Sequence, residues 1–346
     1  MKKIILFLIL STSINCFAQK TTKGFSIVEQ KDQKQINILY DGKLMTAYCY
    51  YDSVMKPFLF PVNTVDGITV TRGWPLQPRA GERTDHPHHT GIWQNYESVN
   101  DLDFWNNSTA IAADKKNLYG TIRHEKIINK KAENGRAELV ATANWLRPDG
   151  HVLMKETTTY SFAVKDKSFI IDRNTVYTAQ DLDVVFKDAK DGFFAIRVAR
   201  ELEMPSDQAD VFTDAHGNKT EVPKSKSNEG VTGKYYSSEG LTGDSVWGTK
   251  GRWCMLKGIK EGKNITIGMF DHPSNIGYPA YWHARGYGLF AVNPLGRKVF
   301  SNGKEELNFT LKKNASVNFK YRLVIASKDM NERDMNKMAD AFALKK

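Results

Sequence analysis

Three of the eight histidines in the chain lie within four residues, at His86, His88 and His89. Pro87 and Gly91 indicate that this segment is a turn at the end of a strand. In an extended chain His86 and His88 point to one face and His89 to the other. Two imidazoles on one face can accept and donate protons near neutral pH, and with further ligands they can bind a metal. We therefore predict that His86 and His88 are catalytic. We predict no cofactor, with a divalent metal as the open alternative.

Arginines and a tryptophan surround this histidine cluster. Arg79 and Arg83 precede it, and a guanidinium can hold a carboxylate or a sulfate by two hydrogen bonds. Trp93 follows it and offers a large apolar surface to one face of a sugar. Arg197 ends the otherwise apolar stretch 192–197, where a charge must be paired or face a pocket. We predict that Arg79, Arg83 and Trp93 bind substrate. Arg197 is either a substrate clamp or half of a structural ion pair.

A second candidate segment lies much later in the chain. Tyr281, His283 and Arg285 alternate there, so in a strand they share one face. Together they combine a proton-transfer group with an anion-binding group. We predict that His283 is the catalytic partner of the first cluster and that Tyr281 and Arg285 bind substrate. This prediction requires the two segments to meet on one side of the fold.

The elements that would position these residues are mainly strands. Segments with alternating apolar and polar residues recur along the chain, and pairs of Asp or Asn with Gly separate them. This rhythm predicts an all-β protein, a large antiparallel β-sandwich. The clearest strands are residues 35–40, 138–143, 168–172, 264–269 and 316–324.

Two segments depart from the strand pattern. Residues 330–344 predict a short C-terminal helix capped by Asp329. The apolar residues that share one face of this helix are Met335, Met338, Ala339 and Phe342. Residues 206–243 are polar and rich in Gly, Ser, Lys and Asn, which predicts a long loop or lid.

The first residues have the pattern of an export signal. Lys2 and Lys3 precede a short apolar run over 4–10, and Ala18 ends the segment. We predict a signal peptide over residues 1–18 and a single β-sandwich domain over residues 19–346. Lipidation of Cys16 fits less well, because that signal needs small residues before the cysteine. The prediction is a periplasmic protein without stable membrane insertion, since no later apolar run is long enough for a membrane helix.

The charge pattern bears on partners. The formal net charge is +10, but the lysines are scattered and form no long basic run. Nucleic acid is therefore not an expected partner. A moderate positive field favours anionic ligands such as uronate or sulfated sugars, although a solvated surface without a partner explains it equally well. The chain has no phosphate-binding Gly-rich loop, no G-x-S-x-G and no H-E-x-x-H, so nucleotide, serine esterase and zincin chemistry are unsupported.

Several pieces of the chain resemble exported Bacteroidetes-type proteins of the "PmoA family", a domain of unknown function. These pieces are residues 67–72, 85–93, 99–100 with 103–105, 190–192 and 271–294. Nothing in them supports the oxygenase activity that the label suggests.

More distantly, the layout is similar to galactose-mutarotase-type β-supersandwiches. The residues that occur in comparable order are Arg79, His86, His88, Trp93 and His283. This resemblance implies a supersandwich fold and a sugar ligand. It leaves the reaction open, because polysaccharide lyases and sugar epimerases share that scaffold.

We therefore predict a periplasmic enzyme that acts on a sugar or oligosaccharide, and in particular on an acidic one, by His-based acid/base chemistry. Lyase or dehydratase chemistry is favoured, because Arg can stabilise the enolate that forms beside a carboxylate. Glycoside hydrolysis needs two facing carboxylates, for which Glu82, Glu97, Asp101 and Asp103 are candidates. An epimerase on the same scaffold or a non-catalytic glycan-binding protein would also fit the residues of the two segments.

Overall fold

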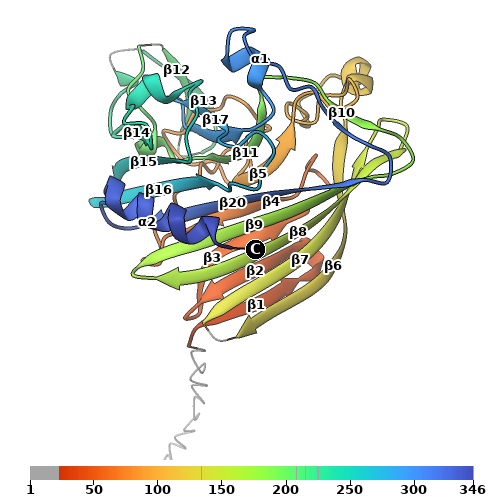
Figure 1. The fold of residues 1–346 in the computed structure, drawn as a ribbon. Coiled ribbons are helices and arrows are strands. Elements are labelled where there is room, and N and C mark those ends of the chain that lie inside the picture. Colours follow the sequence, from red (N-terminus) through yellow and green to blue (C-terminus); the bar gives the residue numbers. More distant parts are fainter. Residues whose placement is uncertain (1–22, 134, 208, 215, 224–225, 346) are drawn as a thin grey trace, which may run out of the picture.

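Two antiparallel sheets pack face to face and enclose the main hydrophobic core (Figure 1). The computed structural model describes residues 23–133, 135–207, 209–214, 216–223 and 226–345, and within these residues each of the two sheets has eight strands. The predicted signal peptide lies outside the described residues. The predicted large antiparallel β-sandwich is confirmed.

The first sheet carries both predicted catalytic segments, one leading into an inner strand and one at its edge. Its strands, in spatial order, are β1 (Phe25–Gln30), β2 (Gln35–Tyr40), β3 (Lys43–Cys49), β4 (Phe58–Val62), β5 (Ile92–Tyr96), β11 (Gly192–Arg197), β18 (Leu289–Asn293) and β17 (Tyr281–Arg285). The histidine cluster leads into β5, and the second candidate segment is β17 itself.

The second sheet consists of longer strands. In spatial order they are β14 (Lys234–Ser237), β15 (Trp253–Lys260), β16 (Lys263–Asp271), β20 (Ser316–Ala326), β9 (Ser168–Ala179), β8 (Val152–Lys165), β7 (Arg136–Leu146) and β6 (Thr121–Glu133). Strict alternation of buried and partly exposed residues along β7 explains why one of its faces joins the core.

Short elements complete the fold. Two small ribbons are formed by β10 (Val184–Phe186) with β19 (Phe309–Leu311) and by β12 (Asp210–Thr213) with β13 (Lys219–Val222). The short helical elements are η1 (Lys31–Gln33), η2 (Ala113–Leu118), η3 (Arg200–Leu202), η5 (Gly243–Val246) and α1 (Arg297–Phe300). The loop predicted over residues 206–243 is therefore wrong in part, because it contains the β12–β13 ribbon and the edge strand β14.

Local sequence explains the predicted strands and their turns. All five strands that we named are found, as β2, β7, β9, β16 and β20. The Asp41–Gly42 pair joins β2 to β3, and both of its residues have positive φ, 47° and 76°. This is the backbone of a type I′ hairpin turn, which Asp-Gly favours.

The C-terminal helix α2 (Glu332–Ala343) covers the outer face of the second sheet, where Figure 1 shows it beside β16. It begins later than we predicted, because Asn331 and not Asp329 caps it by accepting a hydrogen bond from the backbone of Asp334. Its buried residues are Met335, Ala339 and Phe342, which are three of the four predicted.

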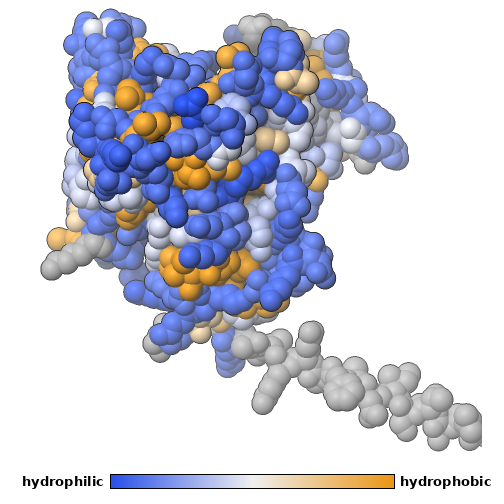
Figure 2. Space-filling model, turned by 90° about the vertical axis from the view of Figure 1, so that its right-hand side faces the viewer, coloured by the Kyte–Doolittle hydropathy of each residue, from blue (hydrophilic) through white to orange (hydrophobic). Residues whose placement is uncertain are grey.

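The exterior is mainly hydrophilic on the side where β6 lies, with separate apolar patches enclosed in it (Figure 2). Among the described helices, none has the length and apolar character that a membrane span requires.

Candidate functional site

The histidine segment is held in place by a buried arginine that our sequence analysis did not select. Arg72 donates hydrogen bonds to the carbonyl and the carboxylate of Asp85, at 2.8 and 2.6 Å. It also donates to the carbonyls of His86 and His89, at 3.0 and 3.1 Å. One guanidinium therefore fixes the whole turn, as its planar set of donors allows.

A glycine closes the same turn against β4. Gly91 has a φ of +58°, and a Cβ at this position would lie 2.0 Å from the carbonyl oxygen of Leu59. Only a residue without a side chain fits here. The close approach brings the histidine segment directly onto the outer face of the first sheet.

Asp85 and His86 form a hydrogen-bonded pair at this turn. Asp85 Oδ2 lies 2.7 Å from His86 Nδ1, and Oδ1 accepts from Arg72 and from Arg197 at 2.6 and 2.7 Å. Burial by itself would raise the pKa of Asp85, but Arg197, His86 and Arg72 hold this pKa well below its usual range. A carboxylate that accepts from Nδ1–H leaves Nε2 of the imidazole free to accept a proton. The His86 side chain is 39% exposed, so it can reach a ligand.

His86 also has an unusual backbone conformation. Its φ is +46°, in the left-handed region that costs energy for a residue with a side chain. Strained residues of this kind persist where the surroundings determine them, and they cluster at functional sites. Here the surroundings are the hydrogen bonds of Arg72.

The other two histidines of the segment are buried. Burial and the nearby charge of Lys56 lower the pKa of His88 to about 2, and burial lowers the pKa of His89 well below its usual value. His89 Nδ1 lies 3.2 Å from the Arg197 guanidinium, which can only donate, so His89 carries its proton on Nε2. Both imidazoles are therefore neutral at neutral pH. His86 is better placed for proton transfer than His88, to which we had given the same role.

The two predicted segments meet on one sheet face. The His86 ring stacks on Tyr287, which follows β17, with centroids 5.0 Å apart and planes 4° apart. His86 also stacks on His89, with centroids 4.7 Å apart. Across the sheet, the strand register places Trp93 and His283 in one row, separated by Ala195 on β11 and Ala291 on β18. Three strand spacings correspond to about 14 Å.

His283 is buried and lies beside a carboxyl group. Its Nδ1 is 3.7 Å from Asp191 Oδ1. Burial and the charge of Arg285 lower the pKa of His283 to about 3, so it is a neutral imidazole, which does not suit the catalytic partner that we predicted to act as an acid. Burial raises the pKa of Asp191 above its usual value, and Asp103 adds to this effect. The pKa of Asp103 is itself raised by burial. Of the two groups, Asp191 is the one whose surroundings favour the protonated form.

A buried lysine, Lys56, is a further residue of the candidate site that our sequence analysis missed. Lys56 is 4% exposed, donates from Nζ to the carbonyl of His88 at 2.6 Å and lies 5.5 Å from the centre of the Trp93 ring. Burial lowers its pKa to about 7, against a weaker opposing effect of Asp103. The signal available in the sequence was a lone lysine within the run Val54-Met55-Lys56-Pro57-Phe58.

Most of the predicted substrate-binding arginines are already paired. Arg83 lies 2.6 Å from Glu203, and Arg197, which is fully buried, contacts Asp85 and His89. Arg79 is partly exposed and lies 3.3 Å from Glu82. For Arg197 the structure therefore favours the ion-pair alternative. Arg83 is buried in a similar pair.

The predicted aromatic and β17 residues differ in accessibility. Trp93 is fully buried between His89 and Trp105, with ring centroids at 5.1 and 5.2 Å, so neither face is open to a sugar. Tyr281 is also buried and stacks on Phe300 at 5.3 Å. Arg285 is half-buried, with its guanidinium 5.8 Å from the Tyr287 ring. Of these residues, only Arg285 is positioned to contact a ligand beside His86.

A cavity of about 580 Å³ borders the Asp85 turn. Its residues are Arg83, Thr84, Asp85, Ala209, Val211, Lys219 and Glu221. The β12–β13 ribbon forms the second wall and is attached to the turn by backbone hydrogen bonds, such as Thr84 N to the Val211 carbonyl at 3.0 Å. This volume lies in the range of small-molecule sites. The predicted loop or lid over residues 206–243 contributes this wall through its β12–β13 ribbon.

The described residues contain no group of three or more His, Cys, Asp or Glu side chains arranged to hold a metal ion. The three histidines of the segment are thus not assembled as a metal centre with these ligand types.

The fold and this arrangement define an antiparallel β-sandwich protein with a buried ionic network and an accessible His–Asp pair on one outer sheet face. The chain belongs to a family of unknown function, DUF6807, whose model matches residues 35–340. No sequence among the curated proteins matches the chain.

Similar solved structures include two α-galactosidases and a mutarotase-like protein. The GH36 α-galactosidase AgaB from Geobacillus stearothermophilus is 11% identical, with a TM-score of 0.41, and the match covers 89% of this chain and 42% of that one. The α-galactosidase from Lactobacillus brevis is 11% identical, with a TM-score of 0.37 and coverages of 89% and 40%. The galactose mutarotase-like protein from Clostridium acetobutylicum is 12% identical, with a TM-score of 0.33 and coverages of 85% and 93%. The chain thus spans about two fifths of the length of the α-galactosidases, and likenesses of this size leave its chemistry to be argued from its own residues.

Proposed function

We propose that the protein is an exported enzyme that acts on an acidic sugar or oligosaccharide, with His86 as the proton-transfer residue and Asp85 as its orienting partner. The observation that carries this proposal is the 2.7 Å pair between Asp85 and a partly exposed His86, in a turn that borders a cavity. A carboxylate that fixes the tautomer and orientation of an imidazole is the arrangement that general acid/base catalysis requires.

Elimination beside a carboxylate is the reaction that these groups support best. His86 Nε2 takes the proton from the carbon next to the sugar carboxylate, and Asp191 gives its proton to the departing sugar oxygen. The carbon–oxygen bond breaks and a carbon–carbon double bond forms, so one proton is accepted and one is released. Arg285 is the accessible cation that can stabilise the negative charge on the substrate carboxylate.

Glycoside hydrolysis is the second candidate, and two carboxyl groups favour it. Asp103 and Asp191 are both partly buried, and burial raises the pKa of each. A retained proton on one carboxyl and a charge on the other are what glycosidases use. The products distinguish the two reactions, since elimination yields an unsaturated sugar and hydrolysis does not.

The test is the turnover of uronate-containing oligosaccharides by wild type and by His86→Gln. We expect kcat to fall about 10²- to 10⁴-fold, with substrate affinity largely retained, because only proton transfer is lost. His151→Gln is the matched control, because His151 also pairs with an aspartate, Asp181, at 3.0 Å but lies in the turn between β7 and β8. Unchanged turnover in His86→Gln would contradict the proposal. Retained binding without any turnover by wild type would favour a glycan-binding protein.

A further inference from the structure

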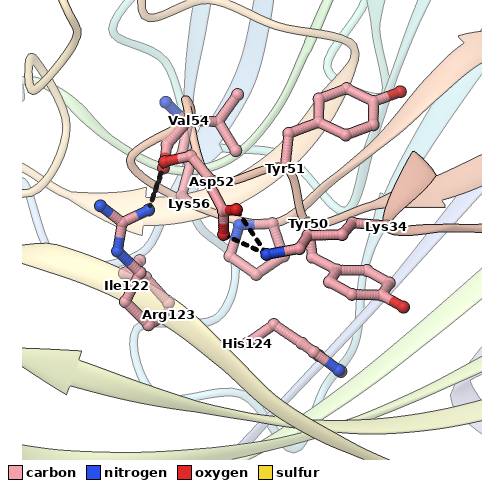
Figure 3. Close-up of a pocket in the computed structure, with 10 residues that line it drawn as sticks. Lys34, Tyr50, Tyr51, Asp52, Val54, Lys56, Ile122, Arg123 and His124 are labelled. Carbon is pink, nitrogen blue, oxygen red and sulfur yellow. Dashed lines mark hydrogen bonds and ion pairs between the residues drawn. The ribbon is translucent and has the colours of Figure 1, made fainter. Parts of the chain in front are cut away.

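A second hollow lies away from the Asp85 turn, between the loop after β3 and the start of β6 (Figure 3). Its volume is about 180 Å³. A neighbouring hollow of about 500 Å³ shares Tyr50 and His124 with it, so the two hollows adjoin at these rings and are treated together. We call this the β6 groove.

Two rings that pack against each other at a tilt lie where the two hollows adjoin. The Tyr50 and His124 rings have centroids 4.2 Å apart and planes inclined by 35°. The buried Tyr48 hydroxyl lies 3.1 Å from His124 Nδ1 and so fixes the imidazole. Rings that are held in place by their neighbours offer a preformed surface to the apolar face of a sugar.

The charges along the β6 groove are mostly positive. Its charged side chains other than His124 are Glu29, Lys31, Lys34, Asp52, Lys56, Arg123 and Lys130. Lys34 pairs with Asp52, as Figure 3 shows, and Lys130 pairs with Glu29. These pairs are exposed or half-exposed, and such pairs are weak enough for an anionic ligand to compete with them. Arg123 donates to the backbone carbonyls of Asp52 and Val54, which carry no net charge to neutralise it.

Lys56 connects the β6 groove with the candidate catalytic site. Its side chain lines the groove, and its Nζ donates to the carbonyl of His88 at 2.6 Å. The groove and the histidine segment therefore lie on two sides of one residue.

We propose that the β6 groove is a second glycan-binding site, which holds a distant part of the same acidic oligosaccharide that reacts at His86. This inference rests on the proposed function in taking a sugar as the ligand. It adds that the substrate is an oligomer and not a monosaccharide, and it assigns binding residues outside the catalytic turn. The lysines attract uronate carboxylates or sulfates, and the Tyr50–His124 pair contacts the sugar ring.

The test compares a dimer and an octamer of galacturonate, with affinities measured by calorimetry on the full chain. The Lys34→Ala/Lys130→Ala variant leaves Asp52 and Glu29 without their partners and lowers the formal charge of the groove from +3 to +1, with every lysine and arginine counted as charged. We expect the octamer to bind about tenfold more weakly to this variant, with the affinity for the dimer unchanged.

The control is Lys298→Ala/Lys312→Ala, which makes the same change in net charge. Lys298 and Lys312 are exposed and pair with Glu306 and Asp183 outside the groove. Equal octamer affinities in the groove and control variants would overturn the proposal, and so would a wild type that does not bind the octamer. Because calorimetry needs no turnover, a failure here is separate from a failure of the His86→Gln test.

Discussion

The outer faces of the two sheets are both covered, but by opposite chemistry. On the second sheet, α2 places Met335 and Phe342 against apolar residues such as Phe270. On the first sheet, the histidine turn places Asp85 over Arg197, and Arg72 and Arg197 are 2% and 0% exposed.

An apolar cover stabilises a fold without needing specific polar partners. Buried charges stabilise it only when every partner is present, because an unpaired buried charge is strongly destabilising. The polar face therefore needs an explanation beyond stability, and an accessible His86 at its rim provides one. The comparison shows that the functional face is identified by the polar groups that cover it. The outward-facing positions of the two sheets follow the same alternation, so this alternation does not distinguish the two faces.

The largest expected effect comes from breaking the ionic network of the first sheet. Arg197→Ala removes donors from Asp85 and His89 and leaves the remaining charges unbalanced, so we expect the free energy of unfolding to fall by about 3–5 kcal/mol. Urea unfolding measures this. Arg285→Ala is the matched control, because Arg285 is half-buried, and we expect it to cost about 1 kcal/mol. Similar losses in the two variants would mean that the network is not the stabilising feature.

The next effect tests the apolar cover of the second sheet. Met335→Ala leaves a cavity under α2, and we expect a loss of about 3 kcal/mol in the free energy of unfolding. Turnover at a temperature where the variant is folded should stay at the wild-type value. Met338→Ala, on the half-buried edge of the same helix, should cost less. A fall in turnover for Met335→Ala would show that the two outer faces are not independent.

Per pH unit, the smallest expected effect is the pH dependence that Lys56 gives to the first sheet. The usual lysine pKa is 10.5, and burial lowers that of Lys56 to about 7. Between these pH values the unfolded chain binds a proton that the folded protein has lost, so the free energy of unfolding rises with pH. The rise is at most about 1.4 kcal/mol per pH unit.

Lys56→Met should remove this slope between pH 7 and pH 10. The measurement is a series of urea unfolding curves across that range, with the exposed Lys312→Met as control. Parallel pH profiles for wild type and Lys56→Met would contradict the buried, weakly paired state of this lysine.

The sequence by itself determined five of the strands, the sandwich class and the approximate helix position, because alternation and turn chemistry are local. It also found the histidine turn and β17, since clustered His, Arg and Tyr are visible in one dimension. The helix cap was misplaced, because Asp329 and Asn331 are both good capping residues and only the backbone shows which one is used.

Only the tertiary structure decided which of these residues are accessible and which are already paired inside the protein. Arg197 pairs with Asp85 across 112 positions of the chain, and Lys56 reaches the His88 carbonyl across 32. Burial and pairing set the charge of each group, and both depend on neighbours that are distant in sequence. For this reason the sequence could name three histidines, and the fold was needed to show that His86 is the one that faces outward.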